Sequence, residues 1–177
     1  MASFEKNEAG VLVPTLAVKG VYHGKIIRAG RVIDEWEEEN LIVNQGLNSI
    51  LGVYLHADTQ ITTWYLGIYS ANYTPVATDT ASNIATNSTE ITTAYSNSTR
   101  PTWTPAAAAS QAIDNSASPA TFTFTSGTNI YGAFLISNST KGGSTGTLFS
   151  AALFASSKTV ANADQLVLTY SFTAASV

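Results

Sequence analysis

The strongest constraint on the fold comes from the C-terminal third of the chain, where apolar and hydroxyl-bearing residues alternate. Residues 121–125 read Thr-Phe-Thr-Phe-Thr, and between Leu166 and Phe172 a large apolar side chain stands at every second position. Successive side chains of a β-strand point to opposite faces, so this period of two predicts strands with one buried face. Further strands are predicted at residues 11–18, 21–28, 31–37, 64–69, 129–137 and 147–155.

One segment has the period of a helix instead. Its apolar stripe, at helical spacing, consists of Leu47, Ile50, Leu51, Tyr54 and Leu55. Asn44 suits an N-cap, so the sequence predicts a helix over residues 45–56. About eight strands and one principal helix favour an all-β fold. We expect an antiparallel β-sandwich or jelly-roll-like domain over residues 11–177, preceded by an N-terminal arm at residues 1–10.

The chain carries few of the side chains that perform chemistry. It has no Cys and two His, and charged residues make up 11% of it, against about a quarter in an ordinary soluble domain. The sequence holds no nucleophile elbow, no phosphate-binding loop motif and no pair of ligands at metal spacing. We therefore expect a structural or binding protein and not an enzyme, with no catalytic residue, no metal and no cofactor.

Charge and hydropathy argue against two classes of partner. The formal net charge is −4, and no cluster of Lys or Arg offers a track for phosphates, so we expect no nucleic acid. Apolar runs such as residues 149–155 are far too short to cross a bilayer, so we expect no membrane. The first residues lack a basic region followed by an apolar stretch, so no secretory signal is expected.

The few charges are unevenly placed. Twelve of the twenty Asp, Glu, Lys and Arg residues fall within the first 40 positions, which leaves eight for the rest of the chain. A surface of Thr, Ser and Asn costs less to desolvate than a charged one. This composition favours a surface that is buried against neighbours in an assembly, and a neutral β surface on a free protein is the alternative.

Five residues are candidates for contacts with a partner. Phe4 is the only large apolar side chain of the expected arm, and Glu37, Glu38 and Glu39 belong to the one dense carboxylate group. That group suits a basic patch on a partner, or a solvated strand end, but lacks the spacing of a calcium loop. Lys141 precedes a glycine-rich stretch that is typical of a flexible hairpin loop.

Four sequence motifs follow one another along the chain, and together they resemble a known class of protein. They are residues 40–48 (NLIVNQGLN), residues 64–69 (WYLGIY), Tyr95 with residues 100–103 (RPTW), and residues 131–134 (YGAF). This order resembles small virion proteins of tailed bacteriophages, the kind encoded among capsid and tail genes. The resemblance covers most of residues 30–175 and implies a virion component, without carrying over any catalytic residue.

Together these features lead us to expect a bacteriophage virion structural protein, first of all a capsid decoration (cement) protein that binds the assembled head and bridges capsid subunits. A tail, neck or collar ring component is one alternative. The implied partners are the major capsid protein or other virion proteins, with a homo-oligomer, trimer favoured, of the chain itself. The implied location is the virion, assembled in the cytoplasm of the bacterial host.

A carbohydrate-binding β module of a fibre is a further alternative, because clustered aromatic rings can stack on sugars. The rings in question are Trp64, Tyr65, Tyr69, Tyr73 and Trp103. The same rings are expected in a core, which is the reading we favour.

Overall fold

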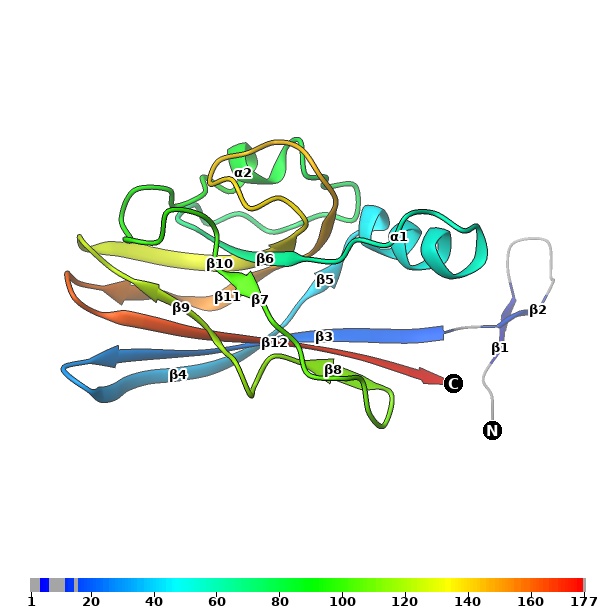
Figure 1. The fold of residues 1–177 in the computed structure, drawn as a ribbon, viewed down its shortest axis with the longest axis horizontal. Coiled ribbons are helices and arrows are strands. Elements are labelled where there is room, and N and C mark those ends of the chain that lie inside the picture. The colour runs from blue at the N-terminus through cyan, green and yellow to red at the C-terminus, as the bar shows by residue number, and fades with distance from the viewer. Residues whose placement is uncertain (1–3, 7–11, 15, 177) are drawn as a thin grey trace.

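The alternating segments pair into two antiparallel sheets that face each other (Figure 1). The computed structural model describes residues 4–6, 12–14 and 16–176. The predicted all-β sandwich with one main helix is confirmed. The two facing sheets hold five strands each, more than the eight in total that were expected. Three of these strands have only two or three residues, too few for a periodic pattern.

The first sheet contains the longest strands. In order across the sheet it consists of β4 (Arg31–Glu39), β3 (Leu16–Arg28), β12 (Gln165–Ser176) and β8 (Ala112–Asp114), and β9 (Ala120–Thr123) also pairs with β12. β3 and β12 pair over twelve residues, with Leu16 opposite Ser176. The predicted hairpin between β3 and β4 turns at Ala29 and Gly30, which both have positive φ.

The second sheet lies across the core from the first. Its strands are β5 (Leu41–Ile42), β11 (Leu148–Val160), β10 (Thr128–Ile136), β6 (Trp64–Tyr69) and β7 (Thr102–Trp103), in that order. β10 is central because it pairs with both β6 and β11. Two of the strands, β5 and β7, are therefore short edges.

Apolar side chains fill the space between the sheets and also cover the far face of the second sheet. The main cluster joins Tyr22 and Leu168 of the first sheet to Leu66 and Leu135 of the second, and none of these is more than 2% exposed. On the opposite face of the second sheet, the segment around α2 (Ile84–Asn87) packs its Ile84 into a second cluster. The fold therefore has three layers, and burial of these side chains drives their assembly.

The principal helix, α1 (Asn44–Leu55), ends one residue before the predicted boundary. The prediction that Asn44 is its N-cap is wrong, because Val43 takes that position with extended dihedrals and no side chain caps the helix. The first turn is anchored instead by backbone bonds, such as the one from Asn44 N to Ala77 O at 2.9 Å. Within the described residues, no helix has the length and apolar character needed to cross a membrane.

Two short strands precede the sandwich. β1 (Phe4–Lys6) pairs with β2 (Leu12–Pro14), and within the described residues the two form a sheet of their own. Figure 1 places them beyond the end of the sandwich at which β3 begins. The expected arm at residues 1–10 thus includes β1, whereas β2 belongs to the segment that follows it.

Candidate functional site

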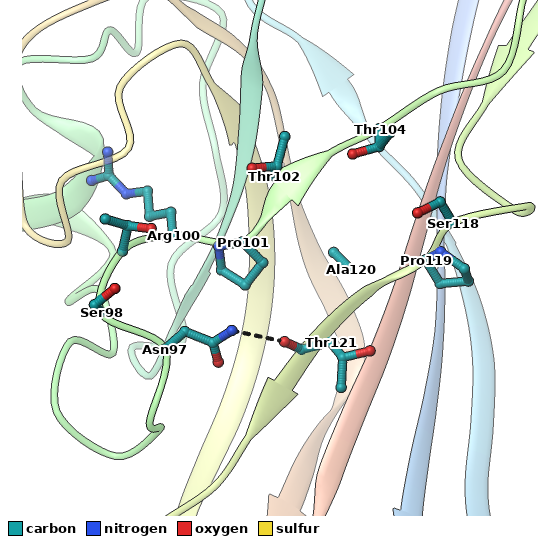
Figure 2. Close-up of a pocket in the computed structure, with 11 residues that line it drawn as sticks. Asn97, Ser98, Arg100, Pro101, Thr102, Thr104, Ser118, Pro119, Ala120 and Thr121 are labelled. Carbon is teal, nitrogen blue, oxygen red and sulfur yellow. Dashed lines mark hydrogen bonds between the residues drawn. The ribbon is translucent and has the colours of Figure 1, made fainter.

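A cleft of about 400 Å³ opens between the extended segment 97–104 and the start of β9 (Figure 2). Most of its lining residues carry a neutral hydroxyl or amide group: Asn97, Ser98, Thr99, Thr102, Thr104, Ser118 and Thr121. Pro101, Pro119 and Ala120 supply the remaining wall with Arg100. The cleft is therefore a polar depression that is open to solvent, and Arg100 is the one charged residue in its lining.

Strand alternation explains why hydroxyl groups point into this cleft. Trp103 of β7 is turned inward, where its Nε1 donates a hydrogen bond to Tyr170 O at 3.0 Å. Its neighbours Thr102 and Thr104 are exposed and line the cleft. On the other wall Phe122 is buried between the sheets, and Thr121 faces outward.

Asn97 ties the two walls together. Its Nδ2 donates a hydrogen bond to Thr121 O at 3.2 Å, the dashed line of Figure 2. Its Oδ1 is buried and has no hydrogen-bond partner among the described residues. Next to it, Ser96 N donates to Thr123 O at 2.9 Å. These two hydrogen bonds hold the segment that contains Ser96 and Asn97 against β9.

Arg100 lines the cleft but directs its charge elsewhere. Figure 2 shows its guanidinium turned away from Thr121. Its Nε and Nη2 donate to the two carboxylate oxygens of Glu90 at 2.8 and 2.7 Å, and its Nη1 donates to Asn138 O at 2.8 Å. Gly142 N also donates to Glu90 Oε2 at 2.8 Å. The buried pair thus clamps the glycine-rich loop that follows β10 and leaves the cleft neutral.

The lining offers hydrogen-bond donors and acceptors, and no Asp, Glu, His or Lys is among the lining residues. Hydroxyl and amide groups bind a partner without the cost of desolvating a charge. Among the described residues, no group of three His, Asp or Glu side chains lies close enough to hold a metal ion. What this cleft can do chemically is bind a neutral polar surface.

The predicted acidic contact residues lie on β4, away from the cleft. Glu37 and Glu39 are exposed, and Glu39 approaches Lys19 Nζ at 3.8 Å. Glu38 is half-buried and accepts a hydrogen bond from Ala155 N at 2.7 Å, which bridges β4 to β11. Glu38 is therefore engaged within the fold, and Glu37 and Glu39 remain at the surface.

The other two predicted contact residues are placed differently. Phe4 lies in β1, and its side chain falls outside the described residues. Lys141 Nζ donates to Tyr95 O at 3.3 Å and sits 4.0 Å from the centre of the Tyr95 ring. Desolvation by this packing lowers the pKa of Lys141. None of the five predicted contact residues lines the cleft.

The aromatic residues considered for sugar stacking are mostly packing groups. Tyr69 and Trp103 are buried, and Tyr69 donates a hydrogen bond to Ala152 O at 2.6 Å. Tyr65 and Tyr73 pack against the second apolar cluster, and Trp64 packs against the main one. The preference for a core role is consistent with these positions.

Sequence reasoning missed the cleft itself. The sequence contains the Arg-Pro-Thr-Trp motif and the Ser-Pro pair before β9. No local sequence pattern predicts that these two segments lie side by side in the fold. In comparisons with known proteins, no protein-family model and no curated protein matches this chain.

Proposed function

We propose that the protein is a structural component of a bacteriophage virion, a capsid decoration protein that binds the outer surface of the assembled head and bridges neighbouring capsid subunits. The observation that carries the proposal is the neutral cleft, with seven hydroxyl- or amide-bearing residues in its lining. Such a cleft suits a polypeptide loop of a partner, whose polar groups are paired on binding without desolvation of a charge. The order of sequence motifs points to the same class of protein.

The distribution of charge supports this proposal. Eight charged residues follow position 40. Four of them, Asp79, Glu90, Arg100 and Asp164, are buried. Lys141 packs on Tyr95, as described above. The surface of the chain after position 40 thus carries fewer free charges than the composition suggests. We expect such a surface on a protein that is packed against neighbouring subunits of an assembly.

Decoration would stabilise the particle by linkage. A copy that binds the assembled lattice and not free subunits lowers the free energy of the assembled state by mass action. Many weak contacts across a lattice then add to a large effect. The bound surface would hold the major capsid protein in its assembled arrangement.

The test blocks the cleft with a charged side chain. Thr104→Arg places a guanidinium at an exposed, cleft-lining position, and Thr93→Arg makes the same change at an exposed position outside the cleft. Both purified proteins are added to particles that lack this chain, and bound copies per particle are counted. We expect Thr93→Arg to bind like wild type and Thr104→Arg to lose most of its occupancy. Equal occupancy of the two variants would contradict a role for the cleft.

The same variants separate the alternatives. Occupancy confined to the tail or neck in labelled particles would favour the ring component. Binding of the isolated protein to a glycan, with loss in Thr104→Arg, would favour a carbohydrate-binding module. The cleft lining includes no aromatic residue for sugar stacking, which is why decoration is preferred.

A further inference from the structure

A second cavity, which we call the aromatic groove, lies beside α1 at one end of the sandwich. Its volume is about 250 Å³, and no charged residue lines it. The main walls are Trp64, Phe149 and Phe172 from the sheets and Ile50, Val53 and Tyr54 from α1. The groove is therefore bounded by the edge of the core on one side and by α1 on the other.

The apolar surface continues from the groove onto α1. Leu51, Tyr54 and Leu55 are 54%, 83% and 82% exposed. A continuous exposed apolar surface of this kind marks an interaction site. The helix α1 thus presents apolar side chains to solvent as well as to the groove.

The groove suits a polypeptide better than a small molecule. Small-molecule sites are usually about 300–1,000 Å³ and place a few free polar groups to orient the ligand. Here the Trp103 Nε1–H is already bonded to Tyr170 O, and the Tyr170 hydroxyl accepts a bond from Asn40 Nδ2 at 3.1 Å. Apart from Ser49 and Gln60, the lining residues offer mainly apolar contact, which an apolar chain segment satisfies.

This chain contains a matching segment at the same end of the fold. Residues 11–16 read VLVPTL, in which five of six residues are apolar. They lead into β3, whose Gly20 pairs with the groove residue Phe172. Within the described residues, β2 (Leu12–Pro14) lies inside this segment and pairs only with β1, and each of the two strands has three residues. A two-stranded hairpin is marginal in water, so it needs a surface to dock on.

The strand direction makes a neighbouring copy the better host. β3 stays paired with β12 as far as Leu16, four residues past Gly20, which carries the chain about 13 Å beyond the position opposite Phe172. Figure 1 places β1 and β2 farther out still, away from the sheets. With the β1–β2 pairing opened, an extended segment of residues 1–15 reaches at most about 50 Å from Leu16, which is enough to meet another molecule.

We propose that the aromatic groove of one copy receives the N-terminal segment, residues 1–15, of a second copy of this chain. The exchange would join copies through a large apolar contact, and the inference does not rest on the virion role. It predicts that the protein self-associates by itself in solution.

The test removes each half of the contact separately in the full-length protein. Deletion of residues 2–15 removes the segment, and Val53→Asp places a carboxylate in the groove wall. Asn48→Asp, at an exposed position of α1 outside the lining, is the matched control. Sedimentation velocity should give an oligomer for wild type and Asn48→Asp. The two disrupting variants should each fall to the mass of one chain, 18.6 kDa for the full-length sequence, with unchanged circular dichroism.

Mixing the two disrupted proteins decides between exchange and docking on the chain's own groove. The deletion variant retains a groove and Val53→Asp retains a segment, so the mixture should form a pair that neither forms alone. A monomeric wild type, a mixture that stays monomeric, or a deletion variant that still self-associates would each overturn the proposal. A monomeric wild type that loses thermal stability on deletion would assign the segment to its own groove.

Discussion

The guanidinium of Arg100 and the carboxylate of Glu90 form a bidentate ion pair with side chains that are 0% and 1% exposed. The pair is not isolated, because Arg100 also donates to Asn138 O and Gly143 O, and Glu90 accepts from Gly142 N. These bonds satisfy both buried charges and hold the loop between β10 and β11 against the segment that forms the cleft. Removal of one partner from a buried pair of this kind leaves the other as an uncompensated buried charge.

Removal of one partner should therefore be severe. We expect Arg100→Met to lower the free energy of unfolding by about 3–5 kcal/mol, because Glu90 is left as an uncompensated buried charge. The double variant Arg100→Met/Glu90→Gln should be more stable than Arg100→Met alone. Urea denaturation measures both, and Lys19→Met, which removes an exposed partner of Glu39, is the control at no more than about 1 kcal/mol. A loss for Arg100→Met as small as that control would be inconsistent with the clamp.

Gly132 allows β10 to pass close under Tyr69. A Cβ at this position would meet the Tyr69 ring and the carbonyl oxygen of Ala152, the two groups joined by the Tyr69 hydrogen bond. We expect Gly132→Ala to cost about 1–3 kcal/mol through overpacking. In Gly127→Ala the nearest atom is Val160 O at 3.4 Å, so this control should lose less. Thermal denaturation that ranks the two variants in the opposite order would refute the close contact.

Asp164 should make the fold sensitive to acid. Its side chain is 2% exposed and accepts bonds from Arg28 Nε at 2.9 Å and from Ala161 N at 2.8 Å. The bond from Arg28 lowers the pKa of Asp164 below its ordinary value of 3.8. The folded state thus binds this proton less readily than the unfolded state. Its contribution is present above that ordinary value and is lost as pH falls through the lower folded pKa.

The measurement is the free energy of unfolding as a function of pH for wild type and Asp164→Asn. We expect Asp164→Asn to be less stable by about 1.5–3 kcal/mol at neutral pH, the range for hydrogen bonds to charged groups. The difference should shrink as pH falls below 3.8. Asp58→Asn, which removes an exposed partner of His56, is the control and should change the free energy of unfolding by no more than about 1 kcal/mol. A difference between wild type and Asp164→Asn that is constant with pH would exclude the Arg28 bond as its source.

Deletion of residues 2–10 should separate folding from assembly. β1 pairs only with β2 within the described residues, so the sandwich should keep its thermal midpoint. If Phe4 docks on a neighbour, each copy loses about 1.5–3 kcal/mol of apolar contact, and occupancy on particles should fall. Melting of the free protein and bound copies per particle are the two readouts. Full occupancy of a normally folded truncated protein would show that residues 2–10 take no part in assembly.

Local patterns predicted the elements that bury one face. Leu166, Leu168 and Tyr170 alternate in the sequence and are all fully buried in β12. The helical stripe likewise placed α1 to within one residue at each end. Its cap was missed because the chain fixes the helix start by a backbone bond to Ala77, a contact between distant segments. The N-cap preference of a single residue carries no information about such a contact.

The candidate sites depend on contacts of the same distant kind. The cleft exists because β7 pairs with β6 while β9 pairs with β12, which brings segments 97–104 and 118–121 together. The sequence contains both segments but not their pairing. The partner of Arg100 was equally hidden, because Glu90 lies ten residues away along an irregular stretch and meets it only in the folded chain.

The most direct test of the proposed decoration role is a reconstruction of particles produced from a genome that encodes this chain. We predict density for the two five-stranded sheets on the outer surface of the head, with the cleft between 97–104 and 118–121 facing the capsid lattice and the N-terminal segment against a neighbouring copy. Absence of the chain from purified particles, or its presence only in the tail or neck, would show that the protein is not a decoration protein.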